Sequence, residues 1–136
     1  MTDEVSYDIM LLVKVKYQDR QYPQEVNRMA LSDDVLRGYT DTIILRRLSD
    51  GDSYGYQINK TISALSNGTV QMKEATLYTA FRRLEAAGLI RSYWGDEASG
   101  ARRRYYSITS AGLERLFADL DNWKDTKCQL DQLLEG

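Results

Sequence analysis

The stretch from Lys73 to Leu89 most constrains the fold, because it predicts a helix with one apolar face and an opposite face of mostly small side chains. Leu77, Phe81 and Leu84 recur at the spacing of one helical face. The other side carries small, polar or cationic residues: Ala75, Thr76, Thr79, Arg82, Arg83 and Ala86. Short side chains allow close approach to a DNA major groove, and arginine offers a two-pronged donor to guanine. The stretch alone fits an ordinary amphipathic surface helix equally well.

Two further helices are expected before this stretch. The first has Ser32 or Asp33 as its N-cap and ends near residues 50–51. Its apolar residues occupy more than one face, which predicts burial against its own domain on one side and against a partner on the other. The second has Asp52 or Ser53 as its cap and breaks at residues 67–68. Its expected inner face consists of Tyr54, Ile58, Ile62 and Leu65. Three helices joined by short turns match a helix-turn-helix arrangement.

A β-hairpin is expected immediately after the third helix. Gly88 stands where a left-handed C-cap would end that helix, and the strand-like runs 89–94 and 102–108 flank a loop of glycine and acidic or small residues. Arg102, Arg103 and Arg104 open the second strand. Such a charge triplet is usually just a solvated strand end. Beside a helix of this kind, we expect the arginines to meet the phosphate backbone or a minor groove, as the wing of a winged helix would.

The last segment predicts a long helix that begins after Thr109 as N-cap. Its seam residues alternate at spacings of three and four, the a/d pattern of a coiled coil: Leu113, Leu116, Leu120, Trp123, Lys127, Leu130 and Leu134. At 1.5 Å per residue the helix would be roughly 39 Å long, so one winged helix cannot cover its apolar stripe. We therefore expect a homodimer, with the six apolar seam residues at its interface.

Composition excludes several functions. The 136 residues include no histidine and one cysteine, Cys128, so an intrachain disulfide, a Cys/His metal site and His-based catalysis are not expected. We expect no cofactor and no enzyme activity, and a reducing cytoplasm suits such a chain. The apolar run Ile9 to Val13 is too short to span a membrane.

Charge is distributed unevenly along the chain. The net charge is −2 and the pI is about 5.2, which argues against a protein that coats nucleic acid. Residues 71–106, however, hold seven Lys/Arg and four Asp/Glu, whereas residues 107–136 hold three and six. A locally positive face on an acidic protein is compatible with DNA binding, because only the contacting surface needs to meet phosphate.

Residues 1–28 differ from the remainder, with a strand-like composition at 7–17 and Pro23 in a polar stretch. One hypothesis is a translated leader with Met29 as the natural start; the other is an accessory strand or a disordered arm. The expected organisation is thus an extension at 1–28, a winged helix-turn-helix domain at 29–108 and a dimerisation helix at 109–136.

Four motifs resemble the PadR family of bacterial transcriptional regulators. They are Leu-Arg-Gly-Tyr-Thr-Asp-Thr-Ile-Ile-Leu at 36–45, Asp-Ser-Tyr-Gly-Tyr at 52–56, Glu-Ala-Thr-Leu-Tyr at 74–78, and Tyr-Trp-Gly-Asp-Glu with Arg-Arg-Arg-Tyr-Tyr at 93–106. The resemblance covers roughly residues 32–134. A single C-terminal helix makes the chain similar to the short subfamily, which includes multidrug-responsive repressors.

This resemblance implies a homodimer whose C-terminal helix packs on the partner's first helix, and recognition helices and wings that bind a palindromic operator. In multidrug-sensing members a tryptophan of the C-terminal helix stacks on planar drugs at the dimer centre, and Trp123 resembles its counterpart. Ordinary packing in the interface would explain Trp123 equally well. The expected ligand-binding residues are Leu120, Trp123, Asp119 and Lys127, with the two polar side chains biasing the site toward cations or merely solvating the helix.

The sequence therefore predicts a mainly α fold with a small antiparallel β-hairpin: a winged helix-turn-helix followed by a long C-terminal helix. The expected function is a ligand-responsive repressor that binds double-stranded DNA. The alternative is a winged helix used for protein–protein assembly without DNA. The expected DNA-binding residues are Tyr56, Lys60, Lys73, Ala75, Thr76, Tyr78, Thr79, Arg82, Arg83, Arg102, Arg103 and Arg104.

Overall fold

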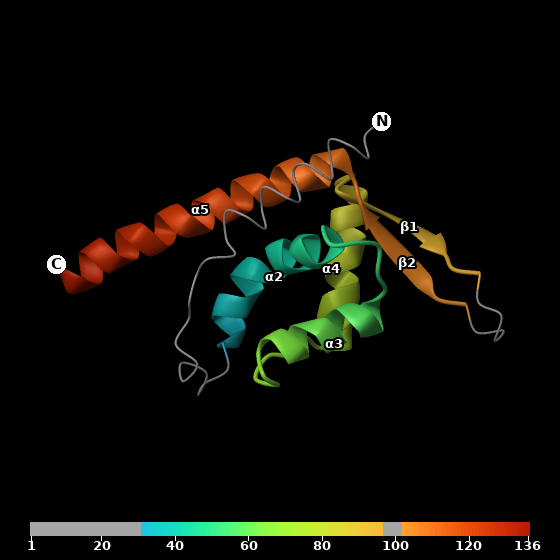
Figure 1. Cartoon of the computed structure of the whole chain (residues 1–136), viewed down its shortest axis with the longest axis horizontal. Coiled ribbons are helices and arrows are strands. Elements are labelled where there is room, and N and C mark those ends of the chain that lie inside the picture. Colours follow the sequence, from blue (N-terminus) through green and yellow to red (C-terminus); the bar gives the residue numbers. More distant parts are fainter. Residues whose placement is uncertain (1–30, 97–101) are drawn as a thin grey trace.

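The computed structural model describes residues 31–96 and 102–136, so the hypotheses on residues 1–28 and on the centre of the hairpin loop fall outside the described residues. The elements in chain order are α2 (Asp33–Leu48), α3 (Gly55–Leu65), α4 (Glu74–Ala86), β1 (Ile90–Trp94), β2 (Arg104–Ile108) and α5 (Ser110–Glu135). The hairpin projects to one side of the helices and α5 runs across the top of α2 (Figure 1). This arrangement confirms the predicted fold class.

Helix α4 lies at the centre of the core. Leu77, Ala80, Phe81 and Leu84 are buried, which includes all three residues of the predicted apolar face. The Phe81 ring stacks on Tyr106 of β2, with 4.0 Å between ring centroids. Burying a large apolar side chain stabilises the fold by about 1.5–3 kcal/mol, so α4 is the element that holds helices and hairpin together.

The predicted caps are confirmed at two helices and wrong at one. The side chain of Ser32 accepts a hydrogen bond from the backbone N–H of Val35, and Thr109 caps α5 in the same way through Gly112. Helix α3, however, has Tyr54 as its N-cap, without a side-chain hydrogen bond. Ser53 instead exchanges both backbone hydrogen bonds with Tyr106, at 3.1 and 2.7 Å, and this β-bridge fixes it outside the helix.

A second correction concerns the inner face of α3. Ile58 and Ile62 are buried as predicted, but Leu65 at the end of the helix is 66% exposed. Asn67 and Gly68 both have positive φ there, so the chain turns away immediately after Leu65 and leaves it at the surface.

The two strands pair antiparallel, in a register that runs from Ile90 opposite Ile108 to Trp94 opposite Arg104. The second strand begins at Arg104 rather than at Arg102, so only one of the three arginines belongs to it. Gly95 donates its N–H to the carbonyl of Arg103 at 2.7 Å, and a Cβ at Gly95 would lie 2.3 Å from the Tyr105 ring. Only glycine lets that ring cross the end of the strand.

The beginning of α5 rests directly on the turn that follows α4. Gly88 has φ +75°, which confirms the predicted left-handed cap. The hydroxyl of Thr109 donates to the Gly88 carbonyl at 2.7 Å. One turn later, a Cβ on Gly112 would lie 2.1 Å from the carbonyl oxygen of Leu89. The first turn of α5 is thus seated on backbone.

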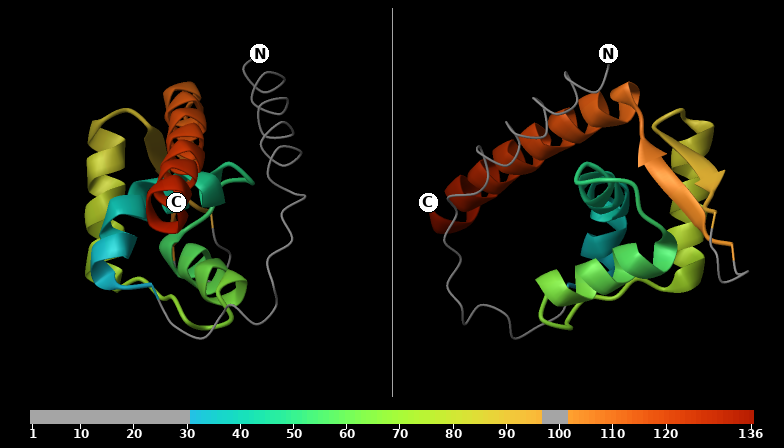
Figure 2. Two further views of the ribbon diagram at one scale, coloured as in Figure 1. Left: turned by 90° about the vertical axis from the view of Figure 1, so that its left-hand side faces the viewer. Right: turned by 45° about the vertical axis from the view of Figure 1, so that its right-hand side comes forward.

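The two halves of α5 have different surroundings. Leu113 and Leu116 are buried in the core of their own chain, which corrects their assignment to a dimer interface, because almost no surface of either is left for a partner. Leu130, Leu133 and Leu134 are 49%, 78% and 81% exposed. The C-terminal half extends past the other described helices (Figure 2).

Among the described residues, no helix combines the length and the apolar character needed to cross a membrane. The same residues contain no group of three or more His, Cys, Asp or Glu side chains that could hold a metal ion.

Candidate nucleic-acid interface

The outward face of α4 is fully accessible. Lys73, the N-cap residue, and Ala75, Thr76, Thr79 and Arg82 along the helix are all exposed. These side chains are short apart from the lysine and the arginine. The helix therefore presents a narrow surface that could approach a duplex closely.

A groove of about 610 Å³ lies between α4 and the hairpin. It brings together six of the predicted DNA-binding residues: Tyr56, Tyr78, Arg82, Arg102, Arg103 and Arg104. Four of the six are arginines, contributed by elements about twenty residues apart in the chain. Such a concentration of guanidinium groups suits a phosphate-rich ligand.

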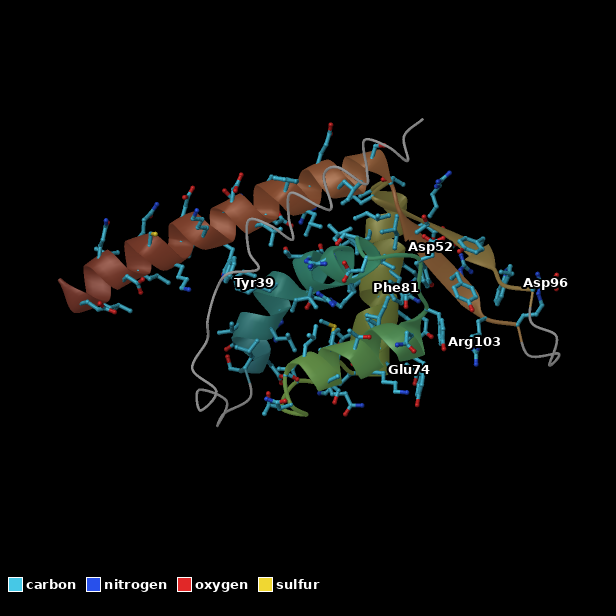
Figure 3. All side chains as sticks on the ribbon, in the orientation of Figure 1. Tyr39, Asp52, Glu74, Phe81, Asp96 and Arg103 are labelled. Atoms are coloured by element: carbon cyan, nitrogen blue, oxygen red, sulfur yellow. The ribbon has the colours of Figure 1, made fainter. Side chains whose placement is uncertain are left out.

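Aromatic rings hold the arginines of the hairpin. The guanidinium carbons of Arg102 and Arg104 lie 5.4 and 5.7 Å from the centroid of Trp94. Arg103 lies 4.8 Å from the Tyr54 ring at the start of α3, and its position beside α3 is seen in Figure 3. These distances are in the range of cation–π attraction. Sequence reasoning missed both Tyr54 and Trp94 as supports, although the aromatic residues that precede each glycine, at 54–55 and 94–95, were a visible signal.

Arg104 is further fixed by polar contacts. Its Nη2 donates to Ser92 Oγ at 2.8 Å and lies 3.6 Å from a carboxylate oxygen of Glu85. Ser92 in turn donates to Glu85 at 2.6 Å. Arg104 is thereby tied to α4 and spans the hairpin and the helix.

The remaining predicted residues line two neighbouring hollows. One lies between α2 and α4 and is lined by Lys73, Ala75, Thr76, Thr79 and Arg83, together with Arg37 of α2. The other lies between α3 and α4 and contains Lys60 with Tyr56 and Tyr78. All twelve predicted residues thus line one of three hollows that surround α4.

Arg83 differs from its neighbour Arg82 in having a carboxylate partner on another helix. It donates to Asp41 of α2 through Nε at 3.4 Å and through Nη2 in a shorter contact. The hydrogen bond to Asp41 raises the pKa of Arg83 above its usual value. Asp41 also lies 3.8 Å from Arg115 of α5, whose Nε donates to both carboxylate oxygens of Asp119 at 3.1 Å.

The outer part of the hairpin, near its loop, is attached to the segment before α3. The Tyr93 hydroxyl donates to a carboxylate oxygen of Asp52 at 2.5 Å. This hydrogen bond, with smaller contributions from burial and from neighbouring charge, raises the pKa of Tyr93 to about 12. The Tyr93 ring also stacks on Tyr105, with 5.6 Å between centroids.

An apolar groove of about 560 Å³ lies away from α4, between α2, α3 and α5. Its lining includes Val35, Tyr39 and Ile43 of α2, and Leu120 and Trp123 of α5. Tyr39 is seen between α2 and the distal half of α5 in Figure 3. The predicted second apolar face of the first helix is the wall of this groove.

The four predicted ligand-binding residues are only partly brought together. Leu120 and Trp123 line the groove, and Lys127 Nζ lies 5.7 Å from the centroid of the Trp123 ring. Asp119 is directed instead to Arg115 and to the Thr42 hydroxyl, which donates to it at 2.8 Å. Its carboxylate therefore serves the packing of α5 on α2.

Comparison with known proteins identifies the class. The transcriptional regulator PadR-like family matches residues 44–118, so the chain belongs to this family, whose members are regulators rather than enzymes. A transcriptional regulator from Clostridium thermocellum has a similar structure, with 46% identity, a TM-score of 0.69, and coverage of 74% of this chain and 97% of that one.

Two further proteins are similar to this chain. A PadR family transcription regulator from Clostridium difficile R20291 is 36% identical, with a TM-score of 0.64 and coverage of 71% and 99% of the two chains. An uncharacterized protein from Lysinibacillus sphaericus is 44% identical over 103 residues, which are 76% of this chain and 94% of that protein. The chain is thus a PadR-like transcriptional regulator with a winged-helix DNA-binding fold.

Proposed function

We propose that this regulator is a ligand-responsive repressor that binds a palindromic operator as a homodimer. The observation that carries the proposal is the arginine-lined groove between α4 and the hairpin. Helix α4 would enter the major groove with Ala75, Thr79 and Arg82 toward the bases. Arg102, Arg103 and Arg104 of the wing, with Tyr78, would meet the backbone, and Tyr56, Lys60 and Lys73 would add contacts along the same strands.

The homodimer is supported by two complementary apolar surfaces. One is the groove that Val35, Tyr39 and Trp123 line; the other is the exposed distal stripe of Leu130 and Leu134. A two-fold axis would place the distal stripe of each copy against the groove of the other. It would also direct two recognition helices to one face of the duplex, with half-site centres a whole number of helical turns apart.

The ligand response is supported by the position of Trp123. An indole in an apolar groove next to an expected two-fold axis offers a stacking surface for a flat aromatic molecule, and each aromatic pair contributes about 0.5–1.5 kcal/mol beyond burial. A ligand that binds another dimer geometry more tightly than the DNA-bound one would weaken the affinity for DNA. Bound DNA would weaken the affinity for the ligand by the same factor.

DNA binding is tested with two matched arginine variants. Arg82→Ala removes a groove residue, whereas Arg91→Ala removes an exposed arginine of the hairpin that lies outside the groove. On a duplex selected from a randomised library, Arg82→Ala is expected to cost about 1–3 kcal/mol and Arg91→Ala almost nothing. Equal affinities of the two variants would remove Arg82 from the interface. Absence of salt-dependent binding would favour the assembly module without DNA.

Ligand sensing is tested separately. Trp123→Ala is compared with Trp94→Ala, which removes the other tryptophan of the chain, in the wing. Planar dyes should bind the Trp94 variant as tightly as the parent and the Trp123 variant more weakly. A dimeric Trp123→Ala protein with unchanged dye affinity would place the sensor elsewhere.

A further inference from the structure

The two consecutive arginines of α4 lie on different sides of the helix. Arg82 lines the groove beside the wing, whereas Arg83 lines the hollow between α2 and α4 with Thr76 and Thr79. Consecutive residues on an α-helix are about 100° apart, so both positions border the same outward face. What distinguishes them is the neighbouring helix: α2 places Asp41 beside Arg83.

The hold on Arg83 is two-pronged. Nε and Nη2 of the guanidinium both donate to the Asp41 carboxylate, a fork geometry that fixes orientation as well as distance. The Asp41 side chain is 22% exposed and the Arg83 side chain 53%, so the carboxylate is the less hydrated partner. Arg115 of α5 also approaches the Asp41 carboxylate, at 3.8 Å.

Without the ion pair to Asp41, Arg83 would be able to contact DNA. Its exposed side chain shares a hollow with Lys73 and Thr79, which belong to the surface that faces DNA in the proposed function. A long unrestrained cation at the edge of that surface would reach phosphate, and a phosphate contact attracts every sequence alike. Each such contact would increase the salt dependence of binding by about 0.9 in the logarithmic slope.

We propose that Asp41 is a specificity-determining residue that withholds Arg83 from the DNA backbone. Of the two consecutive arginines of α4, only Arg82 then contacts DNA. The proposal rests on the proposed function, in which α4 is the recognition helix. Asp41 touches no DNA and acts through Arg83, and is therefore a positioning residue.

Asp41→Asn keeps the size of the side chain and removes the charge that holds Arg83. Affinity for a random-sequence duplex of about 30 base pairs, long enough for two half-sites one turn apart, is measured against salt. We expect the variant to bind it at least about threefold more tightly at ~0.1 M salt, with a steeper slope. Binding to a duplex selected by the parent should tighten less, so discrimination falls.

Two further variants separate the hold on Arg83 from a simple change of net charge. Glu114→Gln removes one negative charge from an exposed position of α5 and should leave both affinities within about twofold. The double variant Asp41→Asn/Arg83→Ala is compared with Arg83→Ala alone, which differs from it by the same single charge. In that background Asp41→Asn should give no gain, because the gain belongs to the released guanidinium. Arg83→Ala alone should leave binding of the selected duplex within about twofold, a result that does not depend on how well Asp41→Asn folds.

The outcomes are distinct. A parent protein that shows no salt-dependent DNA binding overturns the proposed function itself. A parent that binds, combined with an Arg83→Ala variant that loses tenfold or more on the selected duplex, shows that Arg83 contacts DNA and overturns the role of Asp41. A gain of the double variant over Arg83→Ala cannot come from Arg83 and overturns the role of Asp41 equally.

Discussion

The proximal and distal halves of α5 carry the same leucine repeat but meet different surroundings. Leu113 and Leu116 are buried among residues of their own chain, whereas Leu130 and Leu134 remain exposed. A three-four repeat predicts that one face of a helix is buried, but it does not show whether its own chain or a partner covers that face. The position of each leucine relative to the end of the domain decides that question.

The largest expected effect comes from the proximal half. Leu116→Ala would leave a cavity in the core, because the side chain has no exposed surface, and should lower the free energy of unfolding by about 2–5 kcal/mol. Urea unfolding followed by circular dichroism measures it. A loss as small as that of Leu134→Ala, measured at a concentration where the protein is monomeric, would contradict the division of α5.

The next effect concerns the seat of α5. Gly112→Ala places a Cβ against the Leu89 carbonyl and the Ile108 side chain, at 2.1 and 2.7 Å, so the backbone must shift. Overpacking of this kind costs about 1–3 kcal/mol. Gly38→Ala is the matched control in α2, where a Cβ meets nothing within 4 Å and should stabilise the helix by about 0.5–1 kcal/mol. Thermal unfolding should move in opposite directions for the two variants.

The distal half provides a smaller effect of another kind. Leu130→Ala should leave the fold unchanged and weaken the proposed homodimer at least about tenfold, since 1.4 kcal/mol corresponds to a factor of ten. Gln129→Ala, an exposed neighbour on the same turn, is the control. Sedimentation across a concentration series distinguishes them. Identical self-association of both variants would remove the distal stripe from the interface.

The smallest effect lies in the hairpin and appears only at high pH. The folded pKa of Tyr93, about 12, exceeds its ordinary value of 10.0, because the protonated hydroxyl donates to Asp52. The stabilisation is therefore complete below pH ~10 and is lost as the pH rises toward 12. Burial also raises the pKa of Tyr106. Tyrosinate absorbance during alkaline titration should therefore show more than one late-titrating group, of which one disappears in Tyr93→Phe. In Asp52→Asn that group should titrate earlier.

Much of the fold follows from local patterns in the sequence. The core face of α4, the cap at Ser32 and the left-handed residue Gly88 were all predictable, because a helical stripe, an N-cap and a C-cap are each defined within a few residues. The wrong cap of α3 has the opposite origin. Ser53 is held by Tyr106, more than fifty residues away, and such a bridge leaves no local signal.

The candidate site likewise has a part that the sequence predicts and a part that it does not. Residue types and spacing identified the arginines of α4 and the wing, since the chemistry of phosphate recognition is visible in composition. The partner of each arginine was not predictable. Asp41 and Arg83 are 42 positions apart in the sequence. Only the packing of α2 on α4 binds Arg83 to a carboxylate, whereas its neighbour Arg82 lines the groove.

Gly112 also converts a local contact into long-range geometry. Because the first turn of α5 rests on the Leu89 carbonyl without an intervening side chain, this contact helps to set the direction of the helix, together with its packing on α2. Over 26 residues, or about 39 Å, a tilt of only ~5° at this seat displaces the far end by roughly 3 Å. That displacement is comparable to half a helical turn. The contact between Gly112 and the Leu89 carbonyl thus affects the position of Leu134 at the far end of the helix.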